Sequence, residues 1–311
     1  MKKTVFYILL ALLLSYGVRG LLHLGIRMNN EGVYGKFNTA FEKKNNYNTI
    51  FLGSSRSETH FDCAIFDSIN KSNSYNLGME GASIQFSYHI LQAYLRRSET
   101  PKNIILSIDH VFNFEKADTV FMYPRYFAYL NNEKLYNGIK KIDSRFYAFH
   151  YLPFYSMAHM GPKYVQASLR GYFNSASAAD SNYRKGFFPF SDRIYVPENP
   201  KKYLAEQDLL VASYLDSIAL YCKKINAQLT VVISPVHQNF YNATLGADNN
   251  ISDLSKKCKF YDLRFFNYTN DSLCRKNELF YDGFHLNGRG ARKFSLRFSD
   301  DFHNKTHQNP F

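Results

Sequence analysis

Length and composition limit the possibilities before any motif is considered. The chain has 311 residues, of which 45% are hydrophobic and 17% aromatic. That is enough apolar side chain for one large α/β domain, with or without an insertion, and it excludes a disordered chain. The formal net charge of +12 predicts a basic surface suited to anionic partners such as membrane headgroups or acidic glycans. Nucleic acid is not an expected partner, because the chain has no zinc-finger spacing or RNA-binding signature.

The first residues are typical of an export signal. Lys2 and Lys3 precede an apolar run at 4–14, and apolar character resumes at 21–26, beyond Arg19. No small-x-small cleavage site follows the first run, so we expect an uncleaved signal anchor, a single transmembrane helix over residues 1–27. The two lysines would stay in the cytoplasm, which places the main domain on the periplasmic or extracellular side. A cleaved signal peptide is the alternative, and it would also export the domain.

The four cysteines do not form a metal or redox motif. They stand at positions 63, 222, 258 and 274 without a Cys-x-x-Cys pair, which argues against zinc and thioredoxin-type chemistry. In an oxidising compartment Cys258 and Cys274 could pair, whereas Cys63 with Cys222 is a poorer combination. Buried free thiols agree with the spacing at least as well.

Beyond the anchor, apolar runs alternate with amphipathic stretches. Residues 28–46 are polar and rich in Asn and Lys, and we expect a linker there. The patterns predict strands at 49–53, 74–78, 103–109, 228–235 and 259–263, and helices at 84–97, 203–225 and 287–298. This alternation predicts an α/β domain over 47–311, with a mostly parallel sheet covered by helices on both faces. Residues 113–200 interrupt the pattern and are expected to form a largely helical insertion.

Two short segments, far apart in the sequence, carry the parts of a serine catalytic site. Ser54 and Ser55 follow the first expected strand, and Asp282 and His285 form an Asp-x-x-His before the last expected helix. In open α/β sheets, sites form beyond the carboxyl ends of the strands. A serine there needs a base, for which His285 is the candidate, and Asp282 could hold the imidazole in the correct tautomer. The alternatives are a serine that only caps a helix and a histidine in an ordinary turn.

Polar residues at other strand ends are candidates for binding a substrate. Asp109 and His110 end the third expected strand, and His237 follows the fourth. Arg56, directly after the two serines, could bind an anionic substrate or could hold the turn through a nearby carboxylate such as Glu58. These side chains are expected to converge on one cleft, because the carboxyl ends of parallel strands share an edge.

The order of these segments resembles the SGNH, or GDSL-like, hydrolase superfamily. Three family blocks have counterparts here, namely Gly53-Ser54-Ser55, Gly81 within residues 76–83, and Asp282 with His285. Aligning the glycine of the first block favours Ser55 over Ser54 as the nucleophile. The resemblance covers about 47–112 and 203–300. It implies a three-layer α/β/α sandwich and an oxyanion hole formed by the backbone amides of Ser55 and Gly81.

One position departs from the family pattern. Where the family has an asparagine whose side chain donates to the oxyanion, this chain has Asp109. An ionised carboxylate there would repel an oxyanion, so either another donor serves or turnover is weak. The replacement is similar to membrane-anchored branches of the superfamily, including D-alanine-transfer proteins of teichoic acid synthesis and alginate acetylation proteins. Those branches act on cell-envelope polymers, often beside a membrane-bound O-acyltransferase.

These features together predict an exported, membrane-anchored serine esterase or O-acyltransferase. Its substrate would be an acyl ester of a cell-envelope polysaccharide or an acylated small molecule, with a membrane-bound O-acyltransferase as candidate partner. No cofactor or metal is implied, since the chain has no phosphate-cradling glycine loop or ligand-spaced histidine cluster. The lost asparagine motivates an alternative, an inactive SGNH-fold scaffold that binds envelope glycan or an acyltransferase. A third hypothesis is a lipid-facing structural protein, which would show no serine–histidine proximity.

Overall fold

A parallel five-stranded sheet forms the centre of the domain. The computed structural model describes residues 2–111, 113–174, 182–196 and 201–304. The sheet has the order β2-β1-β3-β5-β7, and all four strand pairings are parallel. Its strands are β1 (Thr49–Gly53), β2 (Ser74–Asn76), β3 (Asn103–Ser107), β5 (Gln228–Ile233) and β7 (Arg264–Asn267). Gly53 pairs with Ser107, and Ser107 with Val232, so these strands end level with one another.

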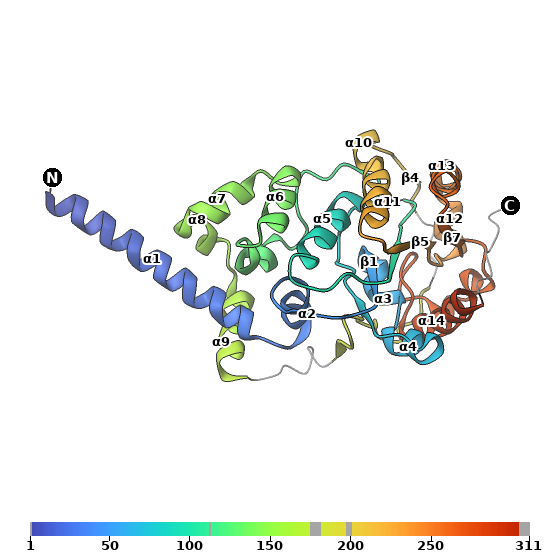
Figure 1. Ribbon diagram of the computed structural model, residues 1–311, viewed down its shortest axis with the longest axis horizontal. Coiled ribbons are helices and arrows are strands. Elements are labelled where there is room, and N and C mark those ends of the chain that lie inside the picture. Colours follow the sequence, from blue (N-terminus) through green and yellow to red (C-terminus); the bar gives the residue numbers. More distant parts are fainter. Residues whose placement is uncertain (1, 112, 175–181, 197–200, 305–311) are drawn as a thin grey trace.

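Helices cover both faces of this sheet (Figure 1). Alternate side chains of β1 point to opposite faces: Ile50 and Leu52 belong to one core cluster, whereas Phe51 belongs to another. The first cluster includes residues of α2 (Gly32–Phe41), α5 (Ile84–Tyr94), α11 (Tyr214–Lys224) and α13 (Ala247–Phe260), and the second includes residues of α4 (Cys63–Asn70) and α14 (Gly288–His303). The expected α/β class with a helix–sheet–helix arrangement is confirmed.

Short elements complete the domain. They are α3 (Ser55–His60), α10 (Leu209–Ala212), α12 (Gln238–Asn242), the two-stranded sheet of β4 (Tyr203–Leu204) and β6 (Thr244–Leu245), and the 3-10 helices η3 (Ser272–Arg275) and η4 (Asn277–Leu279). The helix expected at 203–225 is therefore β4 followed by α10 and α11. Asn287 caps α14 as expected, since its Oδ1 accepts from the Gly290 amide at 2.9 Å.

The insertion is helical in its first part. It contains η1 (Tyr123–Tyr129), α6 (Glu133–Ile142), α7 (Arg145–Tyr151), α8 (Pro153–Ala158) and α9 (Pro162–Phe173). Its second described stretch, 182–196, returns to the sheet, where the Asn76 amide of β2 donates to the Lys185 carbonyl at 2.9 Å, and to α3, where the Phe188 amide donates to the Glu58 carbonyl at 3.0 Å. The insertion therefore contributes residues close to the strand ends.

Two further expected elements differ from the structure. The segment expected as a linker holds α2, because Phe37, Ala40 and Phe41 pack into the first core cluster. The strand expected at 259–263 begins later, at Arg264, because Ile251, Leu254 and Cys258 extend the buried side of α13 up to Phe260. In both segments the helical spacing of a few apolar residues outweighed local composition.

All four cysteines are buried free thiols, so the Cys258–Cys274 pairing weighed from the sequence is not formed. Burial raises the pKa of each thiol to about 12. They pack as small apolar side chains.

The N-terminal helix α1 (Lys2–Met28) projects from the domain (Figure 1). Among the described residues it is the one helix long and apolar enough to cross a membrane, by length and composition. Its first half is exposed, whereas its second half packs against α8, α9 and η1. Gly25 permits this packing, since a Cβ there would lie 2.3 Å from Ser168 Oγ.

Candidate active site

The turn after β1 presents Ser55 at the edge of the sheet. Gly53 has φ +139°, and a Cβ on it would lie 2.3 Å from the Ser107 carbonyl of the neighbouring strand, so this position requires glycine. Ser54 caps α3, with its Oγ accepting from the Arg56 amide at 3.4 Å. Ser55 is the first residue of the helix, and its side chain points elsewhere. The two adjacent serines thus have separate roles.

Ser55, His285 and Asp282 form a hydrogen-bonded chain. Ser55 Oγ lies 2.9 Å from His285 Nε2, and His285 Nδ1 lies 2.9 Å from Asp282 Oδ2. The other oxygen, Asp282 Oδ1, accepts from the backbone amides of Phe284 and His285 at 2.9 and 2.8 Å. With Nδ1 donating to the carboxylate, Nε2 is left to accept the serine proton. The structure therefore brings together the three residues that the two sequence segments supplied.

The hydrogen bonds keep Asp282 ionised. Burial by itself raises the pKa of this carboxyl, but the hydrogen bond and charge of His285 and the two backbone amides outweigh burial and hold the pKa below its usual value. A negative charge beside Nδ1 stabilises the imidazolium that forms when His285 takes a proton. The arrangement suits a histidine that cycles between neutral and protonated forms.

A second buried histidine, not singled out in the sequence, supports the loop that carries His285. His60 Nε2 accepts from the Leu286 amide at 2.9 Å, so its Nδ1 carries the hydrogen and faces Ser234 Oγ at 2.9 Å. Burial, with the charges of Arg56 and His285 adding to it, places the pKa of His60 well below its usual value. His60 thus joins α3, the end of β5 and the loop before α14.

Ser55 opens onto a cavity of about 290 Å³ that also contains Gly81. Its walls are formed by Ser54, Ser55, Gly81, Ala82, Ser83, Asp109, Asn113, Glu115, Lys116, Ala117 and Phe284. Gly81 has φ +72°, and a Cβ there would lie 2.4 Å from the Phe121 Cβ, so glycine is required at this wall as well. The nucleophile and the expected second oxyanion donor face the same small space.

Asp109 lines this cavity, and its carboxylate is paired with Arg56, which does not line the cavity. Asp109 Oδ2 lies 3.4 Å from Arg56 Nη1, and Asp109 Oδ1 accepts from the Val111 amide at 2.9 Å. Asn113, which the sequence analysis did not single out, also lines the cavity; its Nδ2 donates to the Ala82 carbonyl at 2.8 Å. The one feature of the sequence that could have indicated Asn113 as a site residue is its position four residues after Asp109.

Two expected substrate-binding residues, Arg56 and His110, are buried and do not line the cavity. Arg56 is buried and donates to the carbonyls of Ser234 and Pro235, pairing with Asp109 rather than with Glu58. His110 is completely buried, and burial, with the charge of Arg56, lowers its pKa to about 4. Expectation and structure differ because residues that follow neighbouring strand ends can still direct their side chains into the protein interior and away from the cleft.

His237 also has a structural environment. Its Nδ1 accepts from the Asn239 amide at 3.2 Å at the start of α12, and its Nε2 faces Asn277 Oδ1 at 2.7 Å. The ring packs between Tyr195 and Phe280. With both nitrogens engaged and 3% exposure, His237 is unavailable to a substrate in this conformation.

Two larger grooves flank the loop that carries Asp282. One, of about 690 Å³, is lined by Tyr281, Asp282 and Phe284 together with Arg193 and Tyr195. Phe284 also lines the serine cavity, so the groove and the cavity share this side chain. Asp282, whose side chain is 35% exposed, lines the groove.

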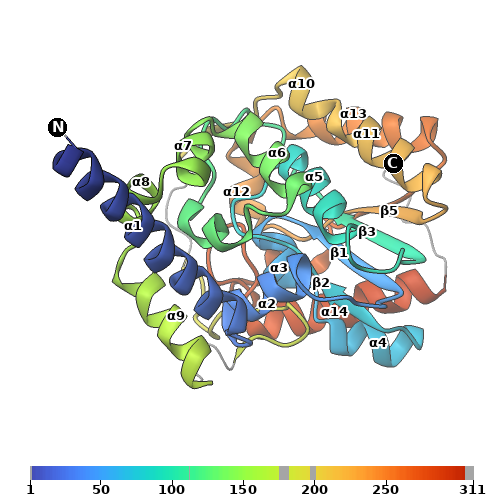
Figure 2. The same cartoon turned by 60° about the vertical axis from the view of Figure 1, so that its left-hand side comes forward.

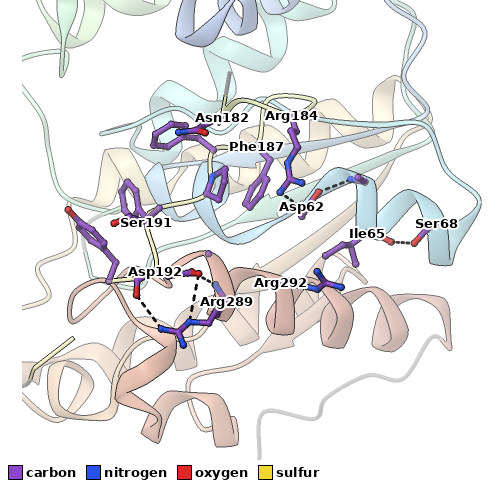
Figure 3. A pocket seen from close by; sticks show the side chains of 16 residues that line it. Asp62, Ile65, Ser68, Asn182, Arg184, Phe187, Ser191, Asp192, Arg289 and Arg292 are labelled. Carbon is purple, nitrogen blue, oxygen red and sulfur yellow. Dashed lines mark hydrogen bonds and ion pairs between the residues drawn. The ribbon is translucent and has the colours of Figure 1, made fainter. Parts of the chain in front are cut away.

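The other groove, of about 1020 Å³, shares Tyr281 with the first and is shown in Figure 3. Phe190 of the insertion forms part of its wall and packs edge-on against His285, with ring centroids 5.1 Å apart. Three arginines line the groove. Arg184 pairs with Asp62 at 3.2 Å, and the Arg289 amide donates to Asp192 at 3.0 Å, while Arg292 stands on the α14 wall (Figure 3). Aromatic and cationic side chains therefore extend away from the triad.

Comparison with known proteins leaves the family open. No protein-family model matches the chain, and no curated protein matches it. Among solved structures, one from Streptococcus pneumonia, described in relation to platelet activating factor, matches with TM-score 0.42 and 13% identity over 96% of this chain and 98% of that one. An acetyl xylan esterase from the rumen bacterium Butyrivibrio proteoclasticus matches with TM-score 0.34 and 10% identity over 85% of this chain and 64% of that one. Similarity at this level does not identify the function of the chain.

Proposed function

We propose that the protein is an SGNH-type serine esterase or O-acyltransferase. The observation that carries this proposal is the 2.9 Å contact between Ser55 Oγ and His285 Nε2, with Asp282 on the other ring nitrogen. A serine hydroxyl becomes a competent nucleophile when a base lies within hydrogen-bond reach and a third group orients that base. The three residues meet this requirement at the mouth of a cavity.

The reaction proceeds in two halves. Ser55 Oγ attacks the ester carbonyl carbon while its proton passes to His285 Nε2. The attacked carbonyl becomes a tetrahedral intermediate whose oxygen carries the negative charge. Collapse breaks the bond to the leaving alcohol, which takes the proton from His285 and leaves an acyl-Ser55. Water or a sugar hydroxyl then attacks the acyl group and gives its proton to His285. The second collapse releases an acid or a new ester and returns the proton to Ser55.

The oxyanion is held by the amides of Ser55 and Gly81, with Asn113 as a third donor. Nδ2 of Asn113 carries two hydrogens, one of which is donated to Ala82; we assign the other to the oxyanion, in place of the asparagine that the family has at position 109. Arg56 neutralises the Asp109 carboxylate, which reduces its repulsion of the developing charge. Turnover then needs no protonation of Asp109.

We place the enzyme at the outer face of a membrane, with α1 as a single-pass anchor and Lys2 and Lys3 in the cytoplasm. The length and composition of α1 support this placement. The open aromatic and arginine-bearing grooves beside the triad suit an extended glycan better than a small ester alone. An acylated envelope polysaccharide is therefore the proposed substrate, and a membrane-bound O-acyltransferase is the proposed partner.

Labelling with a fluorophosphonate tests the proposal directly. This reagent phosphonylates an activated serine, so the full chain is expected to gain one adduct on the tryptic peptide that contains Ser55. Intact-protein and peptide mass spectrometry measure the adduct and its position. Ser54→Ala should still react and Ser55→Ala should not. An unreactive wild-type chain would favour the scaffold hypothesis, which the Asp109 carboxylate in the cavity motivates.

Arg56 is expected to act on the rate through Asp109. Arg56→Met should slow acylation by about 10²-fold, because the Asp109 carboxylate would face the oxyanion without the positive charge of Arg56. The double variant Arg56→Met/Asp109→Asn removes that charge and should regain part of the loss. Single-turnover acylation by p-nitrophenyl acetate measures the rates, and thermal unfolding monitors the fold. A double variant as slow as Arg56→Met would contradict charge repulsion as the cause.

A further inference from the structure

Hydrogen bonds hold the second half of α1 directly against the insertion. Tyr16 Oη donates to the Tyr151 carbonyl at 2.7 Å, Arg19 Nη1 donates to the His150 carbonyl at 3.0 Å, and Tyr172 Oη donates to the Leu21 carbonyl at 2.6 Å. Both views show α8 and α9 beside α1 (Figures 1 and 2). The position of α1 therefore sets the position of α7 to α9.

If α1 spans a bilayer, its contacts with α7 and α8 determine how deeply these two helices lie in the membrane. A hydrocarbon core of about 30 Å takes about 20 helical residues, so a span that starts at Thr4 ends near His23. Tyr16 and Arg19 then lie in the outer half of the bilayer. The end of α7 contacts both of them, so α7 and α8 must reach the same depth.

The exposed surface around α7 and α8 is rich in apolar side chains. The exposed apolar side chains, called the corner patch below, are Tyr147, Tyr151, Leu152, Phe154 and Tyr155. Leu152 and Phe154 are 55% and 52% exposed, which would be costly in water for a contiguous group. Between residues 133 and 173, Lys and Arg number six and Asp and Glu two, a balance that favours anionic headgroups at the rim.

The same packing explains a charge within the apolar span. Arg19 would be expensive in hydrocarbon by itself. Its guanidinium donates instead to the carbonyls of Phe149 and His150, which belong to the last turn of α7, where carbonyls lack partners within the helix. The guanidinium and the carbonyl groups thus meet each other's hydrogen-bonding requirements, as polar groups of segments that enter a membrane must.

From these contacts we infer that the corner patch of α7 and α8 inserts into the outer leaflet of the lipid bilayer beside α1. The inference rests on the proposed anchoring by α1. Anchor and corner patch together hold the domain at two places, so it cannot swing freely about α1. The triad then works at a set distance from the bilayer surface, on acyl esters near the membrane.

The absence of tryptophan from the chain allows a test with one fluorophore at a time. Full-length Phe154→Trp is reconstituted in vesicles of phosphatidylcholine and phosphatidylglycerol, with and without bromine in the acyl chains, and Leu152→Trp is a second probe in case the first disturbs the fold. Leu13→Trp reports on the anchor itself. Phe260→Trp, at an 80% exposed position on α13, is the matched control far from α1 (Figure 1).

Brominated lipid is expected to quench Phe154→Trp at least twofold, between strong quenching of Leu13→Trp and none of Phe260→Trp. Aqueous acrylamide should quench the four variants in the reverse order. Quenching of Leu13→Trp but of neither corner probe would overturn the inference and leave the anchor standing; a blue-shifted corner probe without lipid quenching would assign the patch to a second copy instead. No quenching of Leu13→Trp would overturn both anchor and patch.

Discussion

Replacing Ser55 by alanine is expected to lower the rate of ester hydrolysis by about 10⁴-fold, because the acyl-enzyme can no longer form and only the oxyanion donors and substrate binding remain. His285 keeps its contact with Asp282, so the fold and the cavity should persist. The measurement is p-nitrophenyl acetate turnover by the full chain in detergent, wild type beside Ser55→Ala. Thermal unfolding of both proteins checks that stability is unchanged.

Ser54→Ala is the matched control for this experiment. Ser54 lies in the same cavity wall, but its hydroxyl accepts from the Arg56 amide instead of facing His285. Loss of this helix cap costs about 1 kcal/mol of stability, and the rate should stay within about tenfold of wild type. Equal turnover by wild type and Ser55→Ala would refute the nucleophile assignment. A Ser54→Ala rate as low as that of Ser55→Ala would show that the turn, not one hydroxyl, is being measured.

Lys36→Met is expected to lower the free energy of unfolding by about 3–5 kcal/mol, because it leaves the buried Glu58 carboxylate without its cation. Lys36 is 2% exposed. Its Nζ donates to Glu58 Oε1 at 3.0 Å, to the Gly186 carbonyl at 2.9 Å and to the Gly78 carbonyl. One ammonium thus joins α2, α3, the loop after β2 and the insertion. Urea unfolding of the full chain in detergent measures the loss.

Two further variants define the origin of that loss. Lys36→Met/Glu58→Gln removes the unpaired charge and should be more stable than Lys36→Met alone. Lys43→Met, which removes an exposed lysine that contacts Asn30 at 2.9 Å, should stay within about 0.5 kcal/mol of wild type. If Lys36→Met is as stable as Lys43→Met, the buried pair does not hold these segments together.

The parallel sheet could be predicted because its strands are continuous apolar runs. Residues 49–53, 103–107 and 228–233 are buried almost throughout, and such runs between helical patterns have few other solutions. Elements that depend on distant partners were harder. The segment 28–46 reads as polar, yet Lys36 and Asn38 are buried because partners from other segments satisfy them: Glu58 accepts from Lys36, and Tyr129 donates to Asn38. Spacing within one segment does not reveal such partners.

By itself, the sequence determined the chemical types at the site: a serine after a strand, an Asp-x-x-His before a helix, and an apolar N-terminal run. Only the tertiary structure decided which serine meets His285, because Ser54 and Ser55 differ in orientation and not in chemistry. The same holds for Arg56, which the fold turns inward to pair with Asp109, and for His60, a neutral support found through contacts with Ser234 and Leu286. Hydrogen bonds and an ion pair between segments far apart in the sequence made these assignments, and local sequence does not encode such contacts.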